Sequence, residues 1–191
     1  MNVDVLRVAP SAANLRWLWL SLAVIVVDQV TKHWILAAFR PGEDLPLTPF
    51  ASLVLAFNTG AAFSFLAGED GWQRWLFAAI AVAACAAMVW FMRRGGNALF
   101  SVGLALIIGG AIGNLYDRLA LGHVVDFILL HWRGWYYPAF NVADSAITLG
   151  AASLRTAFET PCALKTTVAP SGISSSDSTN TAPLRFRSST T

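Results

Sequence analysis

Charged residues are scarce in this chain. Asp, Glu, Lys and Arg make up 13% of its 191 residues, and 56% are hydrophobic, whereas soluble domains are about 25% charged. The formal net charge is only +2, and the basic residues form no stripe that could follow a phosphate backbone, so we expect no nucleic-acid partner. The composition is typical of a membrane protein, and the length predicts a single compact bundle.

Cysteine is nearly absent, which narrows the possible chemistry. Cys85 lies inside an apolar run and Cys162 lies in a polar stretch, with no CxxC pair. His123 and His131 are eight residues apart with no second set of ligands beside them. The sequence therefore disfavours a thiol protease and a metal site, and Cys85 is expected to be a small buried residue.

Long apolar runs are what the chain has in abundance. A membrane-spanning helix needs about 20 mostly apolar residues. Asp28 and Lys32 interrupt the first run, and no small-x-small cleavage site follows it, so we expect an uncleaved anchor rather than a removed signal peptide. The four predicted spans cover 15–36, 72–92, 98–115 and a less clear run from 139 onward.

The Lys and Arg residues near the ends of these runs predict the orientation. Basic side chains concentrate on the cytoplasmic side of short loops. They precede the first run, follow the second and end the fourth, at Arg7, Arg16, Arg93, Arg94, Arg155 and Lys165. Both termini are therefore predicted to be cytoplasmic.

Two connecting stretches, 37–71 and 116–138, then face outward. Within the first of them, the β-branched and aromatic run 52–57 predicts a short strand. From residue 160 onward the chain is rich in Ser, Thr and Pro, and we expect 160–191 to be a disordered tail after a single domain over 1–159.

Four acidic residues lie on the outward side of this predicted topology. Asp28, Asp117, Asp126 and Asp144 all fall at the outward ends or outward connections of the predicted spans. Acids at membrane depth cost about 2.5–3.5 kcal/mol each to insert and usually have a partner or a function. Two close carboxyls share a proton, so such a pair suits peptide hydrolysis by water.

Structural roles for the same acids stay open at this point. Asp28 and Lys32 are spaced i, i+4 and can form a simple ion pair. Asp117, next to Arg118, can satisfy backbone groups at a helix end. A proton relay in a transporter would spread its acids through the membrane depth, a scaffold would need no acid cluster, and a presenilin-type protease would carry a GxGD motif, which is absent.

Asparagines recur beside the acids at Asn58, Asn114 and Asn141. An amide both donates and accepts hydrogen bonds, so it can hold a carboxylate or a substrate backbone. Asn141 is equally suited to cap a helix, and both roles can hold at once. Three glycines are expected to let helices pack closely, namely Gly109, Gly110 and Gly113.

Five short blocks in order resemble the lipoprotein signal peptidase (signal peptidase II) family, over about residues 15–154. The blocks are 28–32 (DQVTK), 57–63 (FNTGAAF), 113–118 (GNLYDR), 122–127 (GHVVDF) and 140–146 (FNVADSA). The resemblance implies an all-α membrane fold of four transmembrane helices, with a small outward-facing β-cradle to which 45–57 contribute and a short amphipathic periplasmic helix.

The resemblance also implies an activity. Such an enzyme is an aspartyl endopeptidase of the bacterial inner membrane that cleaves diacylglyceryl-modified prolipoproteins just before the lipidated Cys and is inhibited by globomycin-type compounds. Asp126 and Asp144 match the catalytic pair. The support and substrate-binding positions match Asn58, Gly60, Asn114, Arg118, Asn141, Asp28 and Asp117. No metal or other cofactor is implied, and we expect a monomer with prolipoproteins and membrane lipids as partners.

One departure from the family concerns the fourth run. Its apolar character breaks at Arg155, followed by Thr156 and Glu159. A helix from 139 to 158 would measure roughly 30 Å, which just spans a bilayer. Arg155 could then extend its charge toward the cytoplasmic headgroups.

Overall fold

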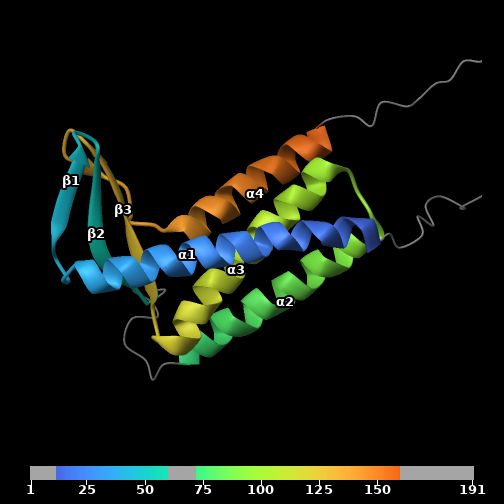
Figure 1. Ribbon diagram of the computed structural model, residues 1–191, viewed down its shortest axis with the longest axis horizontal. Coiled ribbons are helices and arrows are strands. Elements are labelled where there is room, and N and C mark those ends of the chain that lie inside the picture. The colour runs from blue at the N-terminus through green and yellow to red at the C-terminus, as the bar shows by residue number, and fades with distance from the viewer. Residues whose placement is uncertain (1–11, 60–71, 160–191) are drawn as a thin grey trace, which may run out of the picture. The chain divides into compact units, whose positions relative to one another are not determined.

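A computed structural model of the chain describes residues 12–59 and 72–159. Four long helices lie alongside one another with a small antiparallel sheet at one end (Figure 1). The elements are η1 (Ala12–Trp17), α1 (Leu18–Ala38), β1 (Asp44–Thr48), β2 (Ala51–Asn58), α2 (Trp72–Arg94), α3 (Ala98–Ala120), β3 (Val124–Trp132), β4 (Trp135–Tyr136) and α4 (Val142–Glu159).

Helix α3 is the central helix, because α1, α2 and α4 all pack against it. Its glycines make this possible. A Cβ added to Gly109 would lie 2.8 Å from the Ser21 carbonyl oxygen of α1, and one added to Gly110 would collide with the Ala143 carbonyl of α4. The predicted packing role of these glycines is thus confirmed, since backbones meet where a side chain would separate the helices.

Three helical stretches of the described residues are long and apolar enough to cross a membrane: Asn14–Ala38, Trp75–Arg94 and Ala98–Ala120. They correspond to the first three predicted spans. Helix α3 continues past the expected end at residue 115, so Asp117 lies on the helix. Helix α4 begins at Val142 rather than near residue 139 and has 18 residues, and it is not among these stretches.

The chain is not purely helical. Four antiparallel strands form a sheet in the order β1-β2-β3-β4, and the predicted strand at 52–57 lies within β2. The pairing of β2 with β3 shifts by one residue between Leu53 and Ala56, which marks a bulge. The sheet packs on α1, where Ile35 joins Leu55, Val125 and Phe127 in one buried apolar cluster.

The opposite end of the bundle carries basic residues of η1, of the end of α2 and of the second half of α4. The Asn14 side chain donates to the Gly96 carbonyl in the α2–α3 turn over 3.5 Å. The Phe100 and Phe158 rings, at the start of α3 and the end of α4, are 5.8 Å apart. Arg16, Arg94 and Arg155 therefore share the end away from the sheet.

Two expectations fall outside the described residues. No helix other than η1 and α1–α4 occurs in 12–59 and 72–159, so the short periplasmic helix is not found there, and 60–71 are not described. The tail at 160–191 is not described either, and its disorder stays a prediction.

Candidate active site

Asp126 and Asp144 reach the same site from two elements. Asp126 lies in β3 opposite Ala56 of β2, and Asp144 lies in the first turn of α4. Asn141 joins them. Its Nδ2 donates to Asp126 Oδ1 over 2.7 Å, and its backbone N–H donates to Asp144 Oδ2 over 3.2 Å.

Asn141 is also the N-cap of α4. Its Oδ1 accepts the backbone N–H of Asp144 over 2.9 Å, while the Asp144 carboxylate accepts the N–H of Asn141. The two residues form a reciprocal pair like a capping box, which satisfies backbone donors that a helix start leaves open. Both roles considered for Asn141 therefore hold together.

Two further amides complete the contacts of the pair. Asn58 Nδ2 donates to Asp126 Oδ2 over 3.1 Å, and Asn114 Nδ2 donates to Asp144 Oδ1 over 2.8 Å. All four carboxyl oxygens thus accept a hydrogen bond, and the three predicted asparagines all contact the aspartates.

A buried ion network lies behind these amides. Lys32 Nζ is 2.8 Å from Asp28 Oδ2 and 2.8 Å from Asp117 Oδ2, with side-chain exposures of 1%, 0% and 1% for Lys32, Asp28 and Asp117. The predicted Asp28–Lys32 ion pair is confirmed, but it is one half of a three-residue cluster.

Each of these two carboxylates also anchors one element of the site. Asp28 Oδ1 accepts the backbone N–H of Ala143 over 2.9 Å, and Asp117 Oδ2 accepts the backbone N–H of Val125 over 3.1 Å. Ala143 and Val125 immediately precede Asp144 and Asp126. The network therefore sets the backbone positions of both aspartates.

Close packing brings α1 to the site. A Cβ added to Gly113 would lie 2.6 Å from Asp28 Oδ2, so only a glycine leaves room for this carboxylate beside α3.

Arg118 places a positive charge near the pair. Its Nη1 donates to the Asn114 carbonyl over 3.3 Å, and its guanidinium lies 5.4 Å from the centre of the Phe77 ring. Its charge acts on Asp144 and Asp126. Within the part of the chain that the structure describes, its buried Nε has no hydrogen-bond partner.

The two aspartates have unlike surroundings. Burial raises the pKa of Asp126 from 3.8 to about 6, and the negative charge of Asp144 adds to this, while hydrogen bonds from Asn58 and Asn141 act in the opposite direction. A carboxyl with such a pKa can gain and lose a proton near neutral pH, as general acid-base catalysis requires. Asp144 sits at a helix N-terminus, where the helix dipole favours a negative charge.

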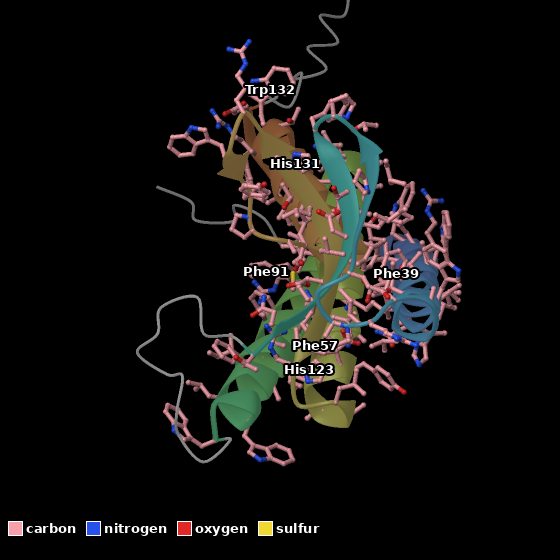
Figure 2. All side chains as sticks on the ribbon, turned by 90° about the vertical axis from the view of Figure 1, so that its left-hand side faces the viewer. Phe39, Phe57, Phe91, His123, His131 and Trp132 are labelled. Atoms are coloured by element: carbon pink, nitrogen blue, oxygen red, sulfur yellow. The ribbon has the colours of Figure 1, made fainter. Side chains whose placement is uncertain are left out.

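His123 and His131 lie at opposite ends of the sheet (Figure 2). His123 stacks against Phe57 with ring centres 4.4 Å apart, and His131 hydrogen-bonds Ser52 over 3.1 Å. Among the described residues, no group of three or more His, Cys, Asp or Glu is placed to hold a metal ion.

The structure brings together every predicted site residue that it describes, and Gly60 lies outside the described residues. Sequence reasoning missed Gln29, whose Nε2 donates to Asp117 Oδ1 over 2.9 Å, and the central position of Lys32. The signal that could have found Lys32 is its position at membrane depth, where a cation needs anionic partners.

A shallow groove opens beside Asp144. It has a volume of about 340 Å³ and is lined by Leu130, Tyr137, Phe140, Asp144, Ser145 and Thr148. Its floor is mostly apolar and aromatic, with the carboxylate at one side, so an extended peptide or an acyl chain could lie there next to Asp144.

Two solved structures are similar to the chain over most of its length. Both are described as a bacterial membrane enzyme, determined by the in meso method at 2.3 Å and 1.9 Å resolution. Their TM-scores are 0.67 and 0.68 and their identities 31% and 32%, over 75% and 80% of this chain and 87% and 94% of theirs. The fold and its apolar helices thus define an integral bacterial membrane enzyme.

The family follows from the sequence comparisons. The family model described as "Signal peptidase (SPase) II" matches residues 20–158. This chain is 59%, 56% and 54% identical to the lipoprotein signal peptidases of Pseudomonas putida, Pseudomonas fluorescens (strain Pf0-1) and Pseudomonas aeruginosa (strain PAO1), respectively. Each alignment covers 74% of this chain and 85–86% of the relative. The chain belongs to the signal peptidase II family.

Proposed function

We propose that this enzyme removes signal peptides from diacylglyceryl-modified prolipoproteins, and that Asp126 and Asp144 hydrolyse the peptide bond just before the lipidated Cys. Family membership supports the substrate class. The observation that carries the assignment of the pair is Asn141, which hydrogen-bonds both carboxylates and holds them on one site.

The two carboxyls take different parts. Asp144, at the start of α4, is the ionised member and takes a proton from the attacking water. Asp126, whose pKa is raised to about 6, carries the shared proton and donates it as a hydrogen bond to the scissile carbonyl oxygen. The tetrahedral intermediate then collapses, the C–N bond breaks, and the proton held by Asp144 passes to the leaving amine of the Cys.

Positive charge and amides hold the substrate backbone. The guanidinium of Arg118 supplies positive charge next to the pair, and Asn58 lies at the end of β2 beside Asp126. Arg118 and Asn58 therefore bind the peptide on either side of the scissile bond. The acyl chains of the substrate lie against the apolar helix surface and the groove beside Asp144.

The membrane topology that fits this reaction has both termini in the cytoplasm. Helix α4 is the fourth span, with Arg155 reaching the cytoplasmic headgroups. The sheet end of the bundle, with the aspartate pair, then faces the periplasm, where prolipoproteins emerge. Membrane lipids surround a monomer in this arrangement.

The first test is cleavage of a lipidated prolipoprotein, followed as a gel shift. Purified protein in detergent is compared with Asp126→Asn and Asp144→Asn. Both variants are expected to insert and fold but to lose turnover, because an amide can neither accept the water proton nor share one. Asp44→Asn, an exposed acid of β1, is the matched control and should cleave like the parent.

This experiment decides whether both aspartates are needed for hydrolysis. Cleavage that survives in folded Asp126→Asn or Asp144→Asn removes that residue from the mechanism.

A further inference from the structure

Lys32 has no place in the chemistry proposed above, yet it lies at the centre of the polar core. Its Nζ contacts Asp28 Oδ2 and Asp117 Oδ2 at 2.8 Å each and Asn114 Oδ1 at 2.9 Å. An ammonium group has three hydrogens to donate and no lone pair. The three contacts therefore use its whole donor capacity, and none is left for a substrate.

The third contact sets the orientation of the Asn114 amide together with Asn141, whose Nδ2 donates to the same oxygen over 3.1 Å. Because an ammonium only donates, the oxygen of Asn114 must face Lys32. The NH₂ group then points the other way and donates to Asp144 Oδ1 over 2.8 Å. A reversed amide would set N–H groups against the ammonium and turn an oxygen toward the Asp144 carboxylate, so both contacts would become repulsive.

The orientation of Asn114 has a consequence for Asp144. Hydrogen bonds to the charged form of a carboxyl favour that form. Asp144 receives one donor from Asn114 and a second from the backbone N–H of Asn141. Both of its oxygens are thereby held as acceptors, which is the arrangement an ionised carboxylate requires.

We propose that Lys32 is a positioning residue of the aspartate pair: by fixing Asn114 as a donor, it keeps Asp144 ionised as the base and leaves the shared proton to Asp126. This inference rests on the proposed function, because it explains how one member of that pair becomes the base. Lys32 acts through Asn114 and does not touch the substrate.

The charges around the aspartate pair decide how the effect of Lys32 on the Asn114 amide can be separated from the effect of its charge. Lys32 with Asp28 and Asp117 carries one positive and two negative charges, and Arg118 is a further cation that acts on Asp126 and Asp144. The charge of Lys32 also lowers the pKa of Asp126. A variant without Lys32 therefore changes the field as well as the Asn114 amide, unless one negative charge is removed with it.

Lys32→Met combined with Asp117→Asn keeps the charge of the cluster at −1. The amide that Asp117→Asn introduces can still accept the Val125 N–H through its oxygen, so the tether to β3 is retained. Its new NH₂ replaces Oδ1 and can donate to Gln29, whose Oε1 has no partner among the described residues. Asp117→Asn alone is the matched control, because it makes the same change and keeps Lys32.

The experiment measures kcat and kcat/KM against pH for the parent, both variants and Lys32→Met. In the double variant the Asn114 oxygen keeps only the donor from Asn141 Nδ2 at 3.1 Å. The amide is then held less firmly, and Asp144 loses part of the hydrogen bonding that favours its charged form. The acid limb of the double variant is expected to move up by about one pH unit, with kcat lowered more than KM is raised. The control is expected to keep its limb in place or move it to lower pH.

Two results would overturn the inference. One is a double variant that folds and whose acid limb coincides with that of the parent, whose cluster carries the same charge. The other is an equal upward shift in Asp117→Asn itself, since Lys32 is present there. The same assay includes Asp126→Asn and Asp144→Asn. If either of these variants still cleaves the substrate, the proposed catalytic pair is wrong; if neither does, a failed pH shift overturns only the role of Lys32.

Discussion

The two ends of the helix bundle differ in the groups that their helices bury where they meet. At the sheet end, α1, α3, β3 and α4 meet through buried charges and amides around Lys32. At the other end, Met92, Leu104, Ala105 and Ile108 form an apolar cluster with no ion pair among them. The first end depends on donors and acceptors at fixed positions, and the second depends on filled volume.

This difference predicts which substitutions each end tolerates. A buried donor whose partner is removed incurs the full cost of its desolvation. An apolar cluster accepts changes of shape so long as volume is kept. A substitution that keeps side-chain size should therefore lower activity when it is made at the sheet end, and should leave activity unchanged when it is made at the apolar end.

The sharpest contrast uses two helix caps. Asn141→Asp keeps an oxygen to cap α4 but sets a second carboxylate against Asp126 in place of the Nδ2 donor. We expect kcat to fall by at least about 100-fold, the scale on which one active-site donor acts. Asn97→Asp makes the same exchange at the cap of α3, where Oδ1 accepts the Phe100 N–H over 2.7 Å, and should retain full kcat. Equal losses at both caps would erase the distinction between the ends.

The apolar end is probed by Leu104→Ala. Leu104 is buried in the cluster, and the cavity left by the smaller side chain should lower the free energy of unfolding by about 2–4 kcal/mol. Thermal unfolding in detergent measures this loss. The kcat of the folded variant should equal that of the parent. A matching fall in kcat at a temperature where the variant is folded would show that the two ends are coupled.

The raised pKa of Asp126 gives a prediction about titration. Its carboxyl is expected to be protonated below about pH 6 and ionised above, which infrared difference spectra of the protonated C=O band can follow. Asp144→Asn removes a neighbouring negative charge that raises this pKa, so the midpoint should move to lower pH. A midpoint that moves upward in Asp144→Asn would contradict the proposed coupling of the two acids.

The smallest effect is expected at the exposed end of α4. Arg155 Nε lies 2.7 Å from Glu159 Oε1, but the two side chains are 80% and 62% exposed. Such surface pairs contribute less than about 1 kcal/mol. Arg155→Ala should therefore unfold at nearly the parent's temperature, with cleavage unchanged. A large drop in unfolding temperature would assign this pair a structural role that its exposure does not support.

The features that could be predicted from the sequence are those that depend on residues close together in the chain. Apolar runs gave α1, α2 and α3 because a spanning helix is a property of consecutive residues. The convergence of Asp28, Asp117, Asp126 and Asp144 followed from their places at the ends of those runs, and the structure joins all four through shared partners.

What could not be predicted depends on partners far away in the chain. Lys32 pairs with Asp117 across α1 and α3, a contact that only helix packing decides. Strand β3 was missed because Val124–Trp132 is a short, mostly apolar run that is equally typical of a buried helix. The start of α4 was placed too early, because the cap at Asn141 rather than hydrophobicity sets it.

The spacing of Asp28 and Lys32 also bears on how the protein is made. Synthesis runs from the N-terminus, so α1 enters the bilayer before α3 has left the ribosome. On a lone helix, residues four apart face each other, and the ion pair at 2.8 Å lets the two charges enter lipid as a neutral couple. Asp117 arrives later, within α3, and Lys32 then holds it as a second anion. We therefore expect the same lysine to serve first as the counter-ion of Asp28 during insertion of α1, and only afterwards as the residue that joins α1 to α3.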